Sequence, residues 1–441
     1  MRGVLKRSNC GHQVQSTMGV MMVGAVLFAG CPSVATASTP PASSGTGTTP
    51  PPVTTAGSSR LKQIDLAALQ AMVDKTAREL MVPGALVLLR TPQGEFTASY
   101  GTTQLGTAST PSADTHFRVA SNTKTMTAAV IMLLAQERKL SLDDPVSKYV
   151  PGVPNGDKIT IAELLEMRSG LYNYTDAPEL WASLDRDQTK VWSPDEVLAI
   201  AFARRANFPP GTTYQYNNTN YALLGLIAEK ADGKPLAQVM HDRLFGPLGM
   251  QHTVLPASTV NTIPDPHARG YGYGSTAVVL SDESPYPPEV LSAARAGTLP
   301  PTDYTGLSPS FATAAGGATS TANDLAVWIR ALVSGRVFNA EYQRRWFDAL
   351  QPQDPSKPDG QQYGYGVSQL RWGPNAIYFH GGETPGYNSK ICYDPANQMT
   401  LVVWTNMAVS LDGQQPANTL MVNVLDQIYE LSPLSPPPPR A

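Results

Sequence analysis

Three short segments carry residue types that together could perform one reaction: Ser121-Asn122-Thr123-Lys124, Tyr216-Asn217-Asn218 and His380-Gly381-Gly382. A serine hydroxyl is a weak nucleophile until a base removes its proton. A lysine amine serves as that base only where burial or nearby cations lower its pKa from about 10.4. A tyrosine hydroxyl can pass a proton between the serine, the amine and a leaving group, which is typically worth about 10²–10⁴ in rate. The three segments therefore predict covalent catalysis by a serine.

The first segment supports this chemistry only if it begins a helix. Residues 125–134 (TMTAAVIMLL) are largely apolar and suit a helix. Because residues three apart lie on one helical face, Lys124 would lie beside Ser121. Free backbone N–H groups at the helix N-terminus would favour negative charge on a bound group.

Alone, the Ser-x-x-Lys pattern is weak evidence. Ser59 and Lys62 also match it, but they end a low-complexity stretch and no apolar strand precedes them. Ser121 follows the segment 117–120 (FRVA) and precedes a long apolar run, and the other two segments lie downstream. A motif gains force from such a context.

The hydrophobic pattern predicts which elements surround these segments. It indicates helices at 64–81, 160–167, 194–204, 219–232, 236–245 and 415–430, a β-hairpin formed by 85–89 and 96–100, and strands at 376–379, 390–393 and 399–405. Strands at both ends, with helices between them, predict that the two ends of the domain meet in one sheet. The stretch 262–312 is rich in Pro, Gly, Ser and Tyr, which suits either a rim over a cleft or a surface loop.

Between about 64 and 428, a set of short sequence motifs occurs in a fixed order, among them 140–146 (LSLDDPV), 208–212 (FPPGT), 315–320 (AGGATS) and 380–387 (HGGETPGY). This ordered set resembles the penicillin-recognising serine hydrolases: class C β-lactamases, D-alanyl-D-alanine carboxypeptidases, related esterases and D-aminopeptidases. The carboxypeptidases with a Tyr-x-Asn second motif and a His-x-Gly third motif are the most similar branch. The resemblance implies an α/β fold of the α+β type, an antiparallel β-sheet flanked by helices with an inserted helical lobe. It also implies that the third motif lies on the edge strand of that sheet.

The resemblance further implies a role for each residue of the site. These roles are Ser121 as nucleophile, Lys124 and Tyr216 as the acid/base pair, Asn218 as an amide that orients substrate and lysine, His380 as a strand residue that tunes the network, Gly382 as a point of close backbone approach, and the N–H groups of Ser121 and Glu383 as the oxyanion hole.

The sequence departs from the carboxypeptidase pattern where the substrate carboxylate would be held. That branch uses hydroxyls in the third motif and an arginine two residues after a Tyr-Gly-x-Gly segment, whereas this chain has Gly381, Glu383 and Ser368 at those positions. Arg371 has the opposite strand parity to Ser368, so it is expected to face away. A carboxylate at 383 would repel a substrate carboxylate, including that of a penicillin, and would favour an amine if it pointed into the cleft. Strand parity alone does not decide where Glu383 points.

The composition limits the function further. The chain has 441 residues and a net charge of −3, so a nucleic-acid surface is not expected. It contains no P-loop and no G-x-S-x-G motif, and its six histidines are scattered, so neither a cofactor nor a metal is expected. Of its three cysteines, Cys10 and Cys31 precede the domain and Cys392 lies alone in an apolar stretch. A disulfide within the domain is therefore not expected.

The ends of the chain predict export. Residues 1–30 combine basic side chains with an apolar run, as in a secretory signal, and Cys31 follows a lipobox-like LFAG. Either Cys31 receives a lipid, which would anchor the protein in the cell envelope, or cleavage near Ala37 releases it. Residues 31–60 resemble a disordered Pro/Ser/Thr linker, 61–432 form the hydrolase domain, and 433–441 are a Pro-rich tail.

The leading hypothesis is a cell-envelope serine hydrolase that forms an acyl-enzyme with peptides or amides of D-amino acids, either carboxypeptidase-like or D-aminopeptidase-like. A β-lactamase or carboxylesterase is the alternative within the family. A protein of another class, which binds peptidoglycan or β-lactams without turnover, is the third hypothesis. The expected partner is a small peptide, ester or lactam, with peptidoglycan as a further candidate and membrane contact only through a lipid anchor.

Overall fold

The computed structural model describes residues 60–281 and 285–430. The predicted signal segment 1–30, the linker except Arg60, Cys31 and the tail 433–441 lie outside these ranges, so those assignments stay predictions. Within the described ranges, no helix is long and apolar enough to cross a membrane.

An antiparallel sheet of eight strands organises the domain, in the order β2-β1-β12-β11-β10-β9-β8-β7. Its strands are β1 Gly84–Thr91, β2 Gly94–Gly101, β7 Gln351–Pro352, β8 Gln362–Tyr363, β9 Ser368–Trp372, β10 Asn375–Thr384, β11 Tyr387–Asp394 and β12 Met399–Thr405. β1 pairs with β12, which places strands from the two ends of the domain side by side, as the sequence predicted.

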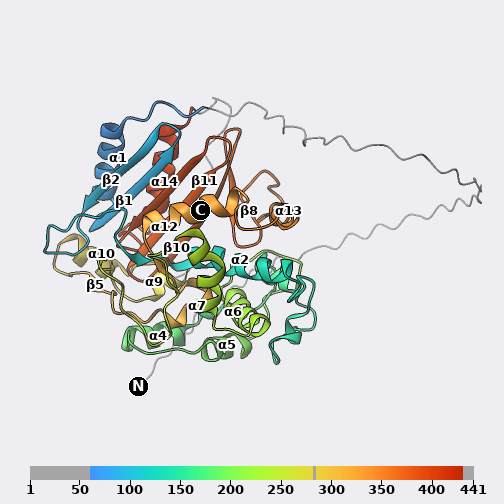
Figure 1. Ribbon diagram of the computed structural model, residues 1–441. Coiled ribbons are helices and arrows are strands. Elements are labelled where there is room, and N and C mark those ends of the chain that lie inside the picture. Colours follow the sequence, from blue (N-terminus) through green and yellow to red (C-terminus); the bar gives the residue numbers. More distant parts are fainter. Residues whose placement is uncertain (1–59, 282–284, 431–441) are drawn as a thin grey trace, which may run out of the picture. The chain divides into compact units, whose positions relative to one another are not determined.

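Both faces of this sheet are covered. Alternate side chains of β1 point to opposite faces: Ala85, Val87 and Leu89 pack beneath α1 (Leu66–Glu79) and α14 (Pro416–Ile428), whereas Leu86 and Leu88 belong to the larger core on the other side. A strand buried on both faces reads as a continuous apolar run rather than an alternating one. The sheet, its two flanking layers and the helical lobe confirm the expected fold class (Figure 1).

The helical lobe lies between the strands in sequence. Its helices are α3 Ile161–Leu165, α4 Pro178–Arg186, α5 Pro194–Phe202, α6 Asn218–Asp232, α7 Leu236–Met240, the π-helical turn η4 His241–Phe245 and α8 Gly246–Leu248. The central helix α2 (Thr123–Gln136) packs against α6 and is buried around almost its whole circumference. An α-helix buried on every side is apolar around its whole circumference, which explains the largely apolar sequence of residues 125–134.

The connecting segments complete the domain. They contain β3 Phe117–Arg118, β4 Tyr271–Gly272, α9 Ala277–Leu280, α10 Pro288–Arg295, β5 Thr302–Asp303, α11 Thr313–Gly316, β6 Thr319–Ser320, α12 Ala322–Val333 and α13 Ala340–Asp348. β3 pairs with β6, and α12 packs on β11 and β12.

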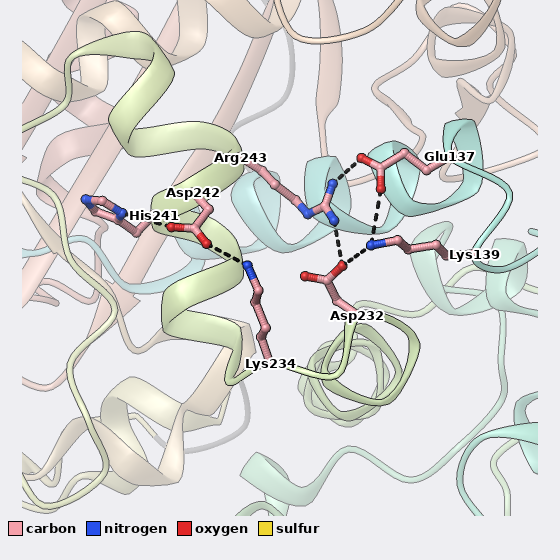
Figure 2. A network of polar contacts seen from close by, with 7 residues as sticks. All are labelled: Glu137, Lys139, Asp232, Lys234, His241, Asp242 and Arg243. Atoms are coloured by element: carbon pink, nitrogen blue, oxygen red, sulfur yellow. Dashed lines mark hydrogen bonds and ion pairs between the residues drawn. The ribbon is translucent and has the colours of Figure 1, made fainter.

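An ion-pair network joins the C-terminal ends of α2 and α6 (Figure 2). Asp232, whose side chain is 4% exposed, accepts hydrogen bonds from Lys139 and from Arg243 of η4, and Arg243 also pairs with Glu137 at the end of α2. Cations near helix C-termini interact favourably with the helix dipoles. The opposite ends of the same two helices carry Lys124 and Asn218, so the network links the two helices that build the site at their far ends.

Candidate active site

Ser121 lies where the chain turns from β3 into α2. It occupies the short 3₁₀ turn Ala120–Asn122 and is partly exposed. Ala120 has a φ of 49°, in the left-handed region that residues other than glycine rarely adopt. Such backbone strain persists where the surrounding structure enforces it, often at functional sites. Here it presents the Ser121 hydroxyl to a pocket next to the helix N-terminus.

Lys124 is arranged to act as a base. Its side chain is fully buried, and its Nζ lies 2.9 Å from Ser121 Oγ, 2.6 Å from Asn218 Oδ1 and 2.8 Å from the Ala315 carbonyl oxygen. Burial holds the pKa of this amine well below its ordinary value. When protonated, this amine donates to all three oxygens; in its neutral form it can donate to Asn218 and Ala315 and accept from the Ser121 hydroxyl.

Tyr216 borders the same group. Its ring centroid is 4.8 Å from Lys124 Nζ. The residue as a whole is 37% exposed. Burial raises the pKa of Tyr216, a hydrogen bond with Ser121 opposes that rise, and the charge of Glu383 adds to it. The phenol is therefore protonated at neutral pH and can donate a proton, while Lys124 is the group able to accept the one from Ser121.

The two adjacent asparagines have different functions. Asn217 is the N-cap of α6 and accepts a hydrogen bond from the Thr219 N–H at 2.8 Å. Asn218 instead faces Lys124 with its carbonyl oxygen and donates from Nδ2 to Thr175 Oγ1 at 2.8 Å. Thr175 thus fixes the orientation of the amide. No pattern in the sequence pointed to Thr175 as part of the site.

His380 is a neutral, buried ring behind Tyr216. Its centroid lies 6.3 Å from that of Tyr216. Burial and the nearby charge of Lys124 lower the pKa of His380 to about 3. The imidazole therefore contributes shape and hydrogen bonds at neutral pH, not charge.

The strand that carries His380 is not at the edge of the sheet, which corrects the prediction. β9 pairs with β10 from Asn375 to Phe379, and only the rest of β10 lacks a strand on that side. The third motif occupies this free part of β10. The sheet thus continues beyond β10, and the part of β10 without a neighbouring strand on that side begins at His380.

Gly382 brings β10 into direct contact with the turn that holds Ser121. A Cβ at this position would lie 2.1 Å from the Val119 carbonyl oxygen and 2.9 Å from Asn122 Nδ2. No side chain fits there, so the glycine is required for the close approach. The N–H of Glu383 follows directly, which keeps it a candidate for the oxyanion hole.

Glu383 lines the same pocket as Ser121. Burial is the main cause that raises the pKa of Tyr216 and lowers that of Lys390; the charge of Glu383 adds to the first shift and opposes the second. This answers the question that strand parity left open: the acidic residue borders the site. Of the positions compared with carboxypeptidases, Ser368 is buried on β9 and Arg371 is exposed, and neither lines the pocket.

The stretch 262–312 forms part of the pocket wall, which agrees with its interpretation as a rim over a cleft. Leu280 of α9 and Phe311 line the pocket together with Tyr174 and Thr175. Asp185 of α4 accepts hydrogen bonds from Ser275 and from the Thr276 N–H, which attaches the start of α9 to the helical lobe. The described residues contain no group of three or more His, Cys, Asp or Glu side chains suited to a metal ion.

A serine next to a buried lysine amine, with a protonated tyrosine and a close-packed strand beside them, is the arrangement of a serine hydrolase. The chain belongs to the beta-lactamase family, whose family model matches residues 70–426.

Two curated relatives agree with this assignment. The chain is 31% identical over 231 residues to Protein flp of Staphylococcus aureus, in an alignment covering 51% of this chain and 45% of the relative. It is 24% identical over 317 residues to the putative penicillin-binding protein PbpX of Bacillus subtilis, covering 72% of this chain and 66% of the relative. The chain thus spans less than half the length of Protein flp.

Two solved structures are similar over most of the chain. The D-stereospecific amidohydrolase from Streptomyces sp. has a TM-score of 0.67 and 29% identity, covering 78% of this chain and 95% of that one. The D-amino acid amidase from Ochrobactrum anthropi, solved with L-phenylalanine amide, has a TM-score of 0.68 and 25% identity, covering 82% and 98%. These neighbours support a hydrolase, the class that the leading hypothesis from the sequence named.

Proposed function

We propose that the protein hydrolyses amides of D-amino acids, or short peptides that begin with a D-amino acid, through an acyl-enzyme on Ser121. The observation that carries this proposal is the buried Lys124 amine 2.9 Å from Ser121 Oγ, in a pocket that Glu383 also lines. The similarity to a D-amino acid amidase and a D-stereospecific amidohydrolase supports the substrate class. A shared fold constrains the mechanism better than the substrate specificity. The choice of an amine-bearing substrate therefore rests on the negative charge of Glu383 in the pocket.

The proposed reaction balances with the groups present. Ser121 Oγ bonds to the substrate carbonyl carbon while its proton moves to Lys124 Nζ. Tyr216 donates its proton to the departing nitrogen as the C–N bond breaks, and it is reprotonated from the Lys124 ammonium. Water then attacks the ester and returns a proton to Ser121, which releases the D-amino acid. Throughout, donors at the N–H groups of Ser121 and Glu383 would stabilise the oxyanion.

Activity of the full-length protein and of Ser121→Ala, the control, tests this proposal. Ammonia release from D-alaninamide and L-alaninamide is measured beside cleavage of D-alanyl-D-alanine and benzylpenicillin, with intact protein masses. We expect serine-dependent turnover of D-alaninamide, at least about tenfold faster than of the L-enantiomer, since 1.4 kcal/mol of differential binding is tenfold. No serine-dependent turnover of any amide would contradict the proposal. A lasting adduct without turnover would instead support the binding protein.

Replacing Glu383 by Gln removes the charge and keeps the shape. If the carboxylate attracts the substrate ammonium, KM for D-alaninamide should rise about tenfold, the value of one modest ion pair, with kcat changed less than twofold. N-acetyl-D-alaninamide, which has no ammonium, should show no such change. Glu341→Gln, at an exposed ion pair of α13, is the matched control. Equal KM changes for both amides would reject a charge-based role for Glu383.

One observation favours a second candidate, a D-alanyl-D-alanine carboxypeptidase-like activity. A Cβ on Gly381 would lie 2.8 Å from Lys390 Nζ, so the Lys390 side chain crosses the position at which the carboxypeptidase branch carries a hydroxyl. A cation there would suit a substrate carboxylate and would offset Glu383. N-acetyl-D-alanyl-D-alanine has a free carboxylate and no free amine, and its faster turnover than that of D-alaninamide would select this candidate.

A further inference from the structure

The segment Tyr363-Gly364-Tyr365-Gly366 lies against the turn of α2 that contains Lys124. Gly366 has a φ of 75°, and a Cβ on it would lie 2.5 Å from the Ala128 Cβ and 3.1 Å from the Lys124 carbonyl oxygen. A Cβ on Gly364 would lie 3.2 Å from the backbone of Ala349. No side chain fits at Gly366 and Gly364 is tightly packed, so the backbone of the segment is closely confined. The Tyr363 side chain, 2% exposed, is therefore held in one place.

Tyr363 contacts His380 through a hydrogen bond. Its hydroxyl oxygen lies 3.2 Å from His380 Nε2, and His380 Nδ1 lies 2.6 Å from the Gly381 carbonyl oxygen. A carbonyl oxygen only accepts, so Nδ1 carries the proton of the neutral ring. Nε2 then has a lone pair, and the Tyr363 O–H donates to it. The two hydrogen bonds together select one tautomer and one orientation of the imidazole.

The same two rings support Tyr216. The Tyr216 ring lies edge-on to Tyr363, with centroids 6.5 Å apart, and next to His380. Tyr221 of α6 donates to the Leu165 carbonyl oxygen at 3.0 Å and lies beside Tyr363. Tyr216, whose hydroxyl is hydrogen-bonded to Ser121, thus rests on a packed group of aromatic side chains from the sheet and the helical lobe.

We propose that Tyr363 is a positioning residue that acts through His380: its hydrogen bond to Nε2 holds the imidazole neutral and in one orientation, and this ring holds the Tyr216 hydroxyl beside Ser121. The titratable groups that face His380 are Lys124 from α2, Tyr216 from the loop before α6, Tyr363 from β8 and Lys390 from β11. Both lysines act on the ring in the same direction, against its protonation. The role depends on the serine mechanism of the family and not on the substrate proposed above.

The substitution Tyr363→Phe tests this role, because it removes one hydroxyl and keeps the ring. We expect kcat for a Ser121-dependent alkyl ester, ethyl acetate, to fall about tenfold with KM within twofold, since small misplacements of a reacting group cost rate rather than binding. Its leaving alkoxide needs the proton that Tyr216 donates. Tyr365→Phe removes a hydroxyl from the same segment, away from His380, and should change neither quantity.

Two further measurements separate positioning from a general structural effect. Nitrogen NMR of histidine-labelled full-length protein should show the Nδ1–H tautomer in the parent and in Tyr365→Phe, and loss of that single tautomer in Tyr363→Phe, whether or not the ester is turned over. In a His380→Asn background, Tyr363→Phe should cost no further activity, because the partner is gone. Multiplicative losses in the double variant, or an unchanged tautomer in Tyr363→Phe, would overturn the proposal.

Discussion

Replacing Lys124 by Met is expected to lower kcat/KM by about 10³–10⁴, because it removes the base that activates Ser121 while nearly preserving the volume of a buried side chain. The amine has no substitute within reach: Tyr216 is protonated at neutral pH and His380 has a pKa of about 3. The measurement is the steady-state rate on the best amide substrate. Lys148→Met, at an exposed ion pair with Asp144, is the control and should leave the rate unchanged.

The pH profile of the parent should carry the signature of the same amine. Acylation requires neutral Lys124, so kcat/KM falls as pH falls through the lowered pKa of this group. Tyr216 must stay protonated, and its raised pKa places the alkaline limb above the ordinary tyrosine range. An alkaline-only activity, rising through the usual lysine pKa, would contradict a neutral amine in the folded enzyme.

Stability supplies an independent check on Lys124. The folded pKa is below the unfolded value near 10.4, so between the two the unfolded chain binds the additional proton and the free energy of unfolding rises with pH, by at most about 1.4 kcal/mol per pH unit from this group. The burial penalty is fully present below the folded pKa and disappears near the ordinary one. Lys124→Met lacks this contribution. Urea titrations at pH 7 and pH 9.5 should therefore show the parent gaining stability relative to the variant.

The sequence predicted best what is local. Ser121 and Lys124 are three residues apart on a helix, so their contact follows from helix geometry once the apolar run identifies the helix. Strands β1, β2 and β12 followed from hydrophobic runs bounded by turn residues. The meeting of Tyr216, Asn218 and His380 with that pair is non-local, and only the family resemblance supplied it.

What the sequence missed depends on tertiary contacts. The Ala315 carbonyl that accepts from Lys124 is a backbone atom, present at every position, and nothing in the sequence marks this one. The choice between Asn217 as cap and Asn218 as active-site amide depends on where α6 begins. The family resemblance implied that the third motif lies on an edge strand, and the short strands β9 and β8, which extend the sheet beyond β10, were not predicted. Tyr363 entered the sequence analysis only as the start of the Tyr-Gly-x-Gly segment, which served to locate the carboxypeptidase arginine; this chain has Ser368 at that position.

The two adjacent glycines of the third motif should respond very differently to the same substitution. In Gly382→Ala, the new Cβ would lie 2.1 Å from the Val119 carbonyl oxygen and 2.7 Å from Ser389 Oγ, and the backbone carbonyl cannot move without moving the turn that holds Ser121. In Gly381→Ala, the nearest atom is Lys390 Nζ at 2.8 Å, the far end of a flexible side chain that can swing away.

We therefore expect Gly382→Ala to lose about 2–4 kcal/mol of unfolding free energy, as for overpacking of a rigid site, and Gly381→Ala to lose less than about 1 kcal/mol. The strand must shift by roughly 1 Å to accept the methyl group, which displaces the Glu383 N–H from Ser121 and should cost at least about 10² in kcat/KM. Urea unfolding and initial rates on the two variants measure both effects. Similar losses in the two would mean that β10 is not packed rigidly against the Ser121 turn, and that the oxyanion site is formed only when substrate binds.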